Sequence, residues 1–120
     1  MKVGRELDAL VAEKVMGWEY RGYGNGGGEW TLGDKKMAFG GHGGGSLPHY
    51  STSIDAAWEV VSVLDKCFGK YWSIVRTESE FEFYANPHDA GDYAPYAEAE
   101  TMSMLLCLAT LKAKGVEVTP

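Results

Sequence analysis

The chain has 120 residues, of which 45% are hydrophobic and 23% charged, with a formal net charge of −6. Such values are typical of one soluble globular domain, here residues 1–120, that can bury a core without disulfides. Proteins that bind long nucleic acids displace counterions with lysine and arginine, and this acidic chain has only 11 basic residues. There is no signal peptide and no apolar run of about 18 residues. The composition therefore argues against nucleic-acid polymers and membranes as partners, and we expect a cytoplasmic protein.

The first predicted element is a helix over residues 5–16. Its apolar side chains share one face, and Gly17 stands where a left-handed residue ends a helix. Residues 18–23 and 29–39 then alternate aromatic or apolar with polar side chains, which predicts two strands. Asn25-Gly26 between them is a strong turn pair for a hairpin.

Residues 22–45 form a glycine-rich insert, in which 11 of 24 residues are glycine. Ordering so much glycine costs conformational entropy. Either these loops move, or a ligand or partner orders them.

The central predicted helix follows this insert and begins at Thr52. The Thr52 hydroxyl and Asp55 match an N-terminal capping box, and Gly69 stands at the expected end. One apolar stripe is predicted to face the core, formed by Ile54, Ala57, Trp58, Val61, Leu64 and Phe68.

The last part of the chain predicts a second hairpin and a third helix. Residues 71–75 and 81–84 read as strands, and 86–95 as a loop. Residues 97–114 read as a helix with acidic residues near its start and lysines near its end. Cys67 and Cys107 both fall in predicted helices, form no C-x-x-C pair, and are expected to be buried, reduced thiols.

The predicted order is thus α-ββ-α-ββ-α. This order predicts an α+β fold, an α-β-α sandwich in which two hairpins form one antiparallel sheet covered by three helices.

Two sequence blocks resemble the phage ABA sandwich domain family. They are LVAEKVMGW at residues 10–18 and LPHYSTSIDAAWEVV at residues 47–61, and the pattern P-x-Y-S-T-x-I-x-x-A-W within the second is the more specific. Trp72-Ser73-Ile74 and the tail Gly115-Val116-Glu117-Val118 add to the resemblance, which spans nearly the whole chain outside the insert. It implies a phage origin, a sandwich fold and self-association. Small phage proteins of comparable build include sponges that sequester cyclic nucleotide-type signals of bacterial immunity.

The best candidate ligand site precedes the central helix, at His49, Tyr50, Ser51 and Thr52. A helix N-terminus offers free N–H groups and a positive dipole to an anion, and the hydroxyls add donors. Glycine backbone could cradle the same anion; the residues concerned are Gly26, Gly27, Gly28, Gly43 and Gly44. The alternative is an ordinary capped helix start, with Tyr50 packed on the core, beside a plain hairpin tip.

Charge and stacking for such a ligand would come from Arg21, Arg76 and Trp30, with Lys35 and Lys36 nearby. Arginine recognises phosphate with two donors, and tryptophan stacks on a base or seals an oligomer interface. The alternative for the arginines is surface solubility.

Three histidines, His42, His49 and His88, raise the question of metal binding or catalysis. None stands in an H-x-x-x-H or H-E-x-x-H spacing, so we expect no metal site, and no cofactor is predicted. Glu78, Glu80 and Glu82 alternate along the second hairpin and read as a solvated sheet face.

Three hypotheses for function remain open. The first is a non-enzymatic phage accessory protein in the cytoplasm of the infected host, which sequesters a small anionic, nucleotide-like ligand as a homo-oligomer of at least two copies. The alternative is a protein–protein interaction module that binds a host factor. The third is a small hydrolase that uses His49 or His88.

Overall fold

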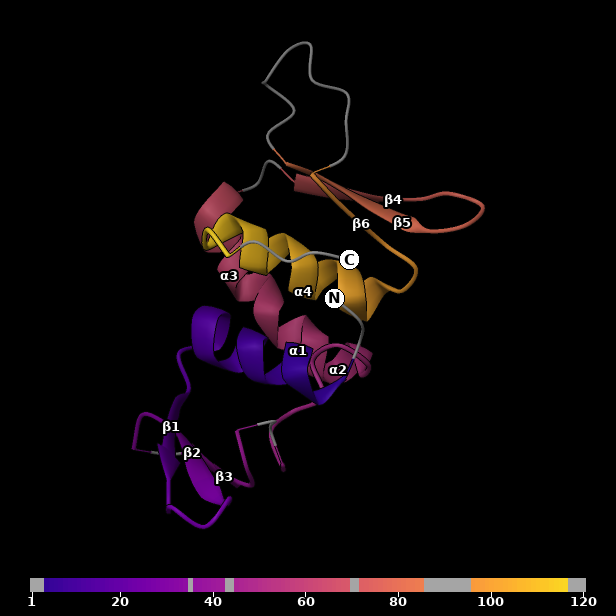
Figure 1. The fold of residues 1–120 in the computed structure, drawn as a ribbon. Helices are drawn as coiled ribbons and strands as arrows, with labels where there is room; N and C mark the ends of the chain where they lie inside the picture. The colour runs from indigo at the N-terminus through magenta and orange to yellow at the C-terminus, as the bar shows by residue number, and fades with distance from the viewer. Residues whose placement is uncertain (1–3, 35, 43–44, 70–71, 86–95, 117–120) are drawn as a thin grey trace.

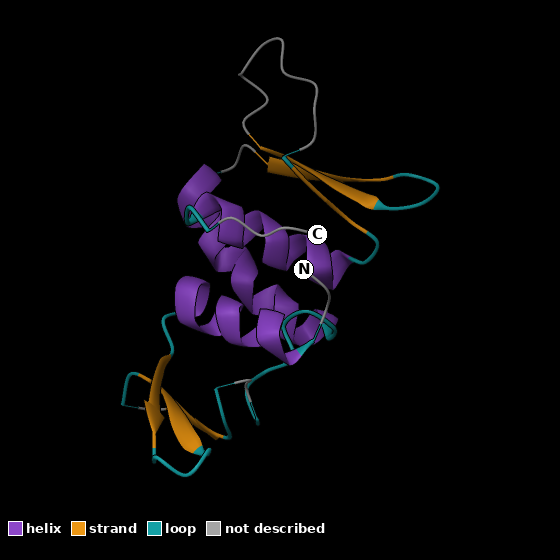
Figure 2. Cartoon of the chain, in the orientation of Figure 1, coloured by secondary structure: helices purple, strands orange, loops and turns teal. Residues whose placement is uncertain are grey.

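Helices occupy the middle of the molecule and a small sheet lies at each end (Figures 1 and 2). The computed structural model describes residues 4–34, 36–42, 45–69, 72–85 and 96–116. The chain measures 51 × 28 × 24 Å along its principal axes, which reflects the two sheets at opposite ends of the helices.

The first helix matches its prediction. It comprises α1 (Arg5–Val11) and a π-helical turn (Ala12–Met16), and Gly17 ends it with φ 86°. Leu7, Val11 and Val15 are buried on the predicted face. The charged residue Asp8 is also buried.

The first sheet contains three strands, β1 (Glu19–Gly22), β2 (Gly28–Leu32) and β3 (Lys36–Phe39), in the order β1-β2-β3. The glycine-rich hairpin between β1 and β2 is confirmed. The prediction of a single strand over residues 29–39 is wrong, because Gly33 takes φ 62° in a turn and folds the second half back as β3.

The central helix exists but presents a different face. It comprises α2 (Ile54–Ala57), a 3₁₀ turn (Trp58–Val60) and α3 (Val61–Phe68). The buried side chains belong to Ala57, Val60 and Leu64, whereas Ile54 and Trp58 are exposed, so the predicted stripe is wrong at those two positions. The buried residues follow the regular helical spacing i, i+3 and i+7, and they include Val60, which the predicted stripe left out; this turns the core-facing side of the helix away from Ile54 and Trp58.

The N-cap of this helix is Ser53 and not Thr52. The Ser53 hydroxyl accepts from the N–H of Ala56 at 3.5 Å, and Thr52 is exposed one residue earlier. The expected capping box is therefore not formed, because the residue three positions after Ser53 is Ala56 and not Asp55.

The second sheet contains β4 (Trp72–Arg76), β5 (Phe81–Ala85) and β6 (Ala97–Ala99), followed by α4 (Met102–Ala113). The predicted second hairpin is confirmed. The last helix begins five residues later than predicted, because residues 97–99 pair with β5 and Thr101 caps the helix, its hydroxyl accepting from the N–H of Met104 at 3.2 Å. The predicted loop at 86–95 lies outside the described residues.

The α+β class and the three helices are therefore confirmed, but one sheet made from two hairpins is wrong. Each hairpin gains the segment that follows it as a third strand, which gives the order α-βββ-α-βββ-α and two separate antiparallel sheets.

The core is built around α4, which contacts α1, α2, α3, β5 and β6. Its buried side chains include Leu105, Leu106 and Cys107. Cys67 on α3 is exposed, so the prediction of two buried thiols holds for Cys107 alone. Across the described residues, no helix has the length and apolarity to cross a membrane.

Candidate functional site

A buried carboxylate joins α1 to the segment before α2. The Oδ1 atom of Asp8 accepts from both the main-chain N–H and the hydroxyl of Ser51, at 2.7 Å each, and neither residue is exposed. The N–H of Gly4 donates to the Ser51 hydroxyl oxygen at 3.0 Å. Ser51 is therefore fully engaged within the fold.

Arg5 supplies the charge that balances this carboxylate. Its Nη1 donates to Asp8 Oδ2 at 2.8 Å, and its Nη2 donates to the carbonyl oxygens of Gly45 and Leu47, at 2.7 Å each. The same guanidinium thus holds the end of the glycine-rich insert against α1. We call Arg5, Asp8 and Ser51 the polar latch.

Tyr50 packs in the core, as the ordinary-cap alternative predicts. Its hydroxyl oxygen accepts from Trp18 Nε1 at 3.1 Å, and burial raises its pKa to about 12. His49 and Thr52 on either side remain exposed, with His49 Nδ1 3.9 Å from Asp8 Oδ2. Of the four residues in the predicted ligand segment, two are exposed and two are internal to the fold.

The described glycines and Trp30 belong to the first sheet. Gly26 and Gly27 lie in the hairpin tip, while Gly28 is buried, and a Cβ there would lie 2.6 Å from the carbonyl oxygen of Arg21. Trp30 is fully buried and its Nε1 donates to the carbonyl of Gly41 at 3.4 Å. Its ring has no exposed face for a ligand base. Gly43 and Gly44 lie outside the described residues, as do Lys35 and His88.

The two candidate arginines lie at opposite ends of the molecule, because Arg21 is on β1 and Arg76 on β4 (Figure 1). Arg76 has its guanidinium carbon 5.8 Å from the centre of the Phe81 ring. The predicted anion-binding residues are thus distributed over the helix start, the first sheet and the second sheet, and those described do not converge on one place.

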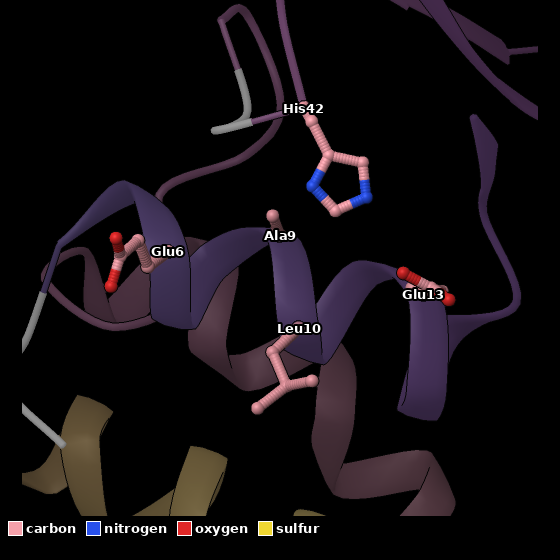
Figure 3. Close-up of a pocket in the computed structure, with 5 residues that line it drawn as sticks. All are labelled: Glu6, Ala9, Leu10, Glu13 and His42. Atoms are coloured by element: carbon pink, nitrogen blue, oxygen red, sulfur yellow. The ribbon is translucent and has the colours of Figure 1, made fainter. Parts of the chain in front are cut away.

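An open groove of about 340 Å³ runs along α1 beneath the glycine-rich insert. Figure 3 shows the imidazole of His42 above Ala9, with Glu6 and Glu13 toward the two ends and Leu10 completing the lining. The ring of His42 also contacts the rings of Tyr20 and Trp30. The two carboxylates at its rim make this groove electrostatically unfavourable for an anionic ligand.

Three carboxylates meet on the outer side of the second sheet. Oxygens of Glu80, Glu82 and Glu98 lie within 4.8 Å of one another, and the pKa of Glu80 is raised chiefly by its hydrogen bond to Glu98. The sequence placed Glu80 and Glu82 on one solvated face but missed Glu98, because residues 97–99 read as helix. Such exposed acidic groups commonly occur without a metal.

Among the described residues, the most exposed large hydrophobic side chain is one that sequence reasoning placed in the core. Trp58 is 60% exposed, and Ile54, one helical turn earlier, is 46% exposed. Residues four apart on a helix lie side by side, so the two side chains share one face. The signal in the sequence is that this helix carries more large apolar residues than one buried stripe needs. We call Ile54 and Trp58 the helix patch.

A comparison with protein families matches the chain to a family of phage proteins. The profile of the phage ABA sandwich domain covers residues 9–111, which include the last three residues of α1, both sheets and nearly all of α4. No curated protein and no solved structure matches the chain. The matched region includes the Asp8-binding residue Ser51 and the helix patch, and it spans more than half of the chain, so the chain belongs to the phage ABA sandwich domain family.

Proposed function

We propose that this phage ABA sandwich protein is a non-enzymatic interaction module that binds another protein through the helix patch. The observation that carries the proposal is the exposure of Trp58 on a helix whose opposite face supplies the core. Tryptophan is among the side chains that dominate the binding energy of protein interfaces.

The surroundings of the helix patch indicate the chemistry of the partner. Asp55 and Glu59 are the exposed neighbours of Ile54 and Trp58 in the sequence of the helix. Glu59 reaches one cation of its own chain, Lys36, at 4.0 Å and in an exposed position where such a pair is weak. A matching surface therefore has an apolar pocket for Trp58 and lysine or arginine at its rim, which suits the net charge of −6.

Sequestration of a small anion stays a prediction and has less support. Ser51, Tyr50 and Trp30 use their polar atoms within the fold, and the groove along α1 has an acidic rim. For hydrolysis, a serine nucleophile needs a base that takes its proton. The Ser51 hydroxyl donates to Asp8, a buried carboxylate already paired with Arg5, which supports a role in folding.

The experiment is affinity capture from phage-infected bacteria with the tagged wild type and two variants. Trp58→Ala removes the helix patch anchor, and Met37→Ala is the matched control, because Met37 is 56% exposed on the first sheet. We expect a protein retained by the wild type and by Met37→Ala, and lost with Trp58→Ala. Purified partner should then bind Trp58→Ala at least about tenfold more weakly than wild type, as for an interface hot spot.

The same captured material separates the proposal from sequestration. The protein is denatured and the released small molecules are measured by mass spectrometry. A nucleotide recovered in fixed ratio to the protein, unaffected by Trp58→Ala, would overturn the proposal in favour of sequestration. Equal capture of every protein by wild type and Trp58→Ala would also overturn it.

A further inference from the structure

The four sheet edges differ in how they are protected against pairing with another strand. Strand β1 has four residues and ends at Gly22, and β6 has three residues. On the outer edge of β3, the main-chain N–H and carbonyl of Phe39 are both bonded to Ser46. Phe39 N donates to Ser46 Oγ and Ser46 N donates to Phe39 O, both at 2.7 Å. Short strands and covered edges are recognised protective devices.

In the part of the chain that the structure describes, strand β4 has none of these devices. It has five residues, Trp72 to Arg76, with two β-branched residues and no glycine, proline or lysine. Within the described residues it pairs with β5 alone. Val75 on this strand is 47% exposed. Strand β4 is therefore the edge best suited to accept a further strand.

The hydrogen bonds of the hairpin determine which residues of β4 offer their backbone. Thr77 N donates to Glu80 O at 2.8 Å, which closes the turn as a hydrogen-bonded pair. Such pairs alternate along an antiparallel ladder, so Val75 and Ser73 turn their polar backbone groups toward Glu82 and Tyr84 on β5. The backbone groups of Trp72, Ile74 and Arg76 then point away from β5, along the open edge.

We propose that β4 pairs antiparallel with β4 of a second copy of this chain, with the two-fold axis at Ile74. In this register Ile74 faces the partner's Ile74, and Trp72 faces the partner's Arg76. All three outward-pointing residues then exchange main-chain hydrogen bonds with the partner. The second sheets of both copies join into one continuous sheet, and the interface is isologous, as in most homodimers.

The side chains favour a second copy over an unrelated strand. Trp72, Ile74 and Arg76 lie on one face of β4, so each Arg76 guanidinium meets the partner's Trp72, a favourable cation–π pair made twice. On the other face Ser73 meets the partner's Val75. No two like charges oppose each other. A shift of the axis to Val75 sets Arg76 against Ile74 and loses one of the three hydrogen-bonded pairs.

Disulfide trapping tests this register directly. In the proposed pairing Ser73 and the partner's Val75 form a non-hydrogen-bonded pair, whose Cα atoms lie about 4.5 Å apart, within the range that a disulfide spans. The variant Ser73→Cys with Val75→Cys is made in a Cys67→Ser background, because Cys67 is an exposed free thiol. All three residues are exposed, so the variant is expected to fold.

We expect the wild type to dimerise with rising concentration in sedimentation velocity, and the double-cysteine variant to form a covalent dimer under mild oxidation. Val75→Cys alone, the matched control, should stay uncrosslinked, because its thiols meet only if the axis lies at Val75. A wild type that stays monomeric up to millimolar concentration overturns the proposal. A dimer that is not trapped, or is trapped by Val75→Cys alone, overturns it as well.

This inference is independent of the proposed function, because it uses a different surface. Trp58→Ala should dimerise like the wild type even if it no longer binds a partner protein. Loss of dimerisation in Trp58→Ala would place the contact at the helix patch and contradict pairing through β4.

Discussion

Replacing Ser51 with alanine measures the contribution of the polar latch. The change removes the hydroxyl donor to Asp8 at 2.7 Å and the acceptor for Gly4 N at 3.0 Å. A hydrogen bond to a charged group contributes about 1.5–3 kcal/mol and a neutral one about 1 kcal/mol. Asp8 keeps its bonds to Ser51 N and Arg5, so we expect a loss of about 2–4 kcal/mol in the free energy of unfolding.

The assay is urea unfolding at neutral pH, followed by tryptophan fluorescence and analysed by linear extrapolation. Ser62→Ala is the matched control, because Ser62 is exposed and its hydroxyl donates to the Glu59 carbonyl one turn earlier in the central helix. That variant should differ from the wild type by less than about 0.5 kcal/mol. If Ser51→Ala costs no more than Ser62→Ala, the assignment of Ser51 to the latch is wrong.

A double-mutant cycle with Asp8→Asn tests whether Ser51 acts through Asp8. Because the two side chains contact each other, their effects should not add, and the coupling should be at least about 0.5 kcal/mol. Additive losses would show that Ser51 stabilises the fold by another route.

Three further predictions concern thiols, alkaline pH and the glycine-rich insert. In native protein at pH 8 a thiol reagent should label Cys67 alone, because burial raises the pKa of Cys107 to about 12, and denaturant should expose the second thiol. The folded state binds the Tyr50 proton more tightly than the unfolded chain does, so the contribution of Tyr50 to the free energy of unfolding is complete below pH 10.0 and is lost as the pH rises toward 12. When unfolding is measured across that pH range, the stability of Tyr50→Phe should decline less steeply than that of the wild type. Gly45→Ala should lower the melting temperature, because φ is +47° and a Cβ would overlap the carbonyl oxygen of Phe39; an unchanged melting temperature would refute this close approach.

The sequence predicted correctly those helices and hairpins that are determined by residues close together in the chain. The helix at residues 5–16 and the two hairpins follow from periodicity and from turn residues such as Asn25-Gly26 and Gly17. Residues 97–99 show where this fails. Alanine and glutamate favour a helix, yet pairing with Phe81 and Phe83 on β5 holds the segment as a strand.

The polar latch could not be predicted in the same way. Asp8 is a charged residue at the edge of the apolar face, three residues before Val11, and its partner Ser51 is 43 residues away in the sequence. Ser51, Thr52 and Ser53 are consecutive hydroxyl residues, and the sequence favoured Thr52 as the N-cap because Asp55 follows it at the capping-box spacing. In the structure the Ser51 hydroxyl is bonded to Asp8 and is not the N-cap, and Ser53 caps the helix instead.

The helix patch was missed because the predicted stripe was drawn through Ile54, Ala57 and Trp58 and left out Val60. With Val60 buried, the core-facing side of the helix runs through Ala57, Val60 and Leu64. The structure buries Ala57 and leaves the two larger residues outside. This difference between the predicted and the observed position of Trp58 is also the most informative result for function, because a tryptophan that the sequence assigned to the core lies on the surface.

Fluorine NMR tests the binding role of Trp58 most directly. The four tryptophans are replaced by 5-fluorotryptophan, and Trp58→Phe identifies the Trp58 resonance by its loss. On addition of the purified partner protein, the proposal predicts that the Trp58 resonance shifts or broadens while those of the buried Trp18 and Trp30 stay in place. An unchanged Trp58 resonance in the bound protein, with a shift at Trp18 beside Tyr50, would contradict the proposal and return attention to the segment at residues 49–52.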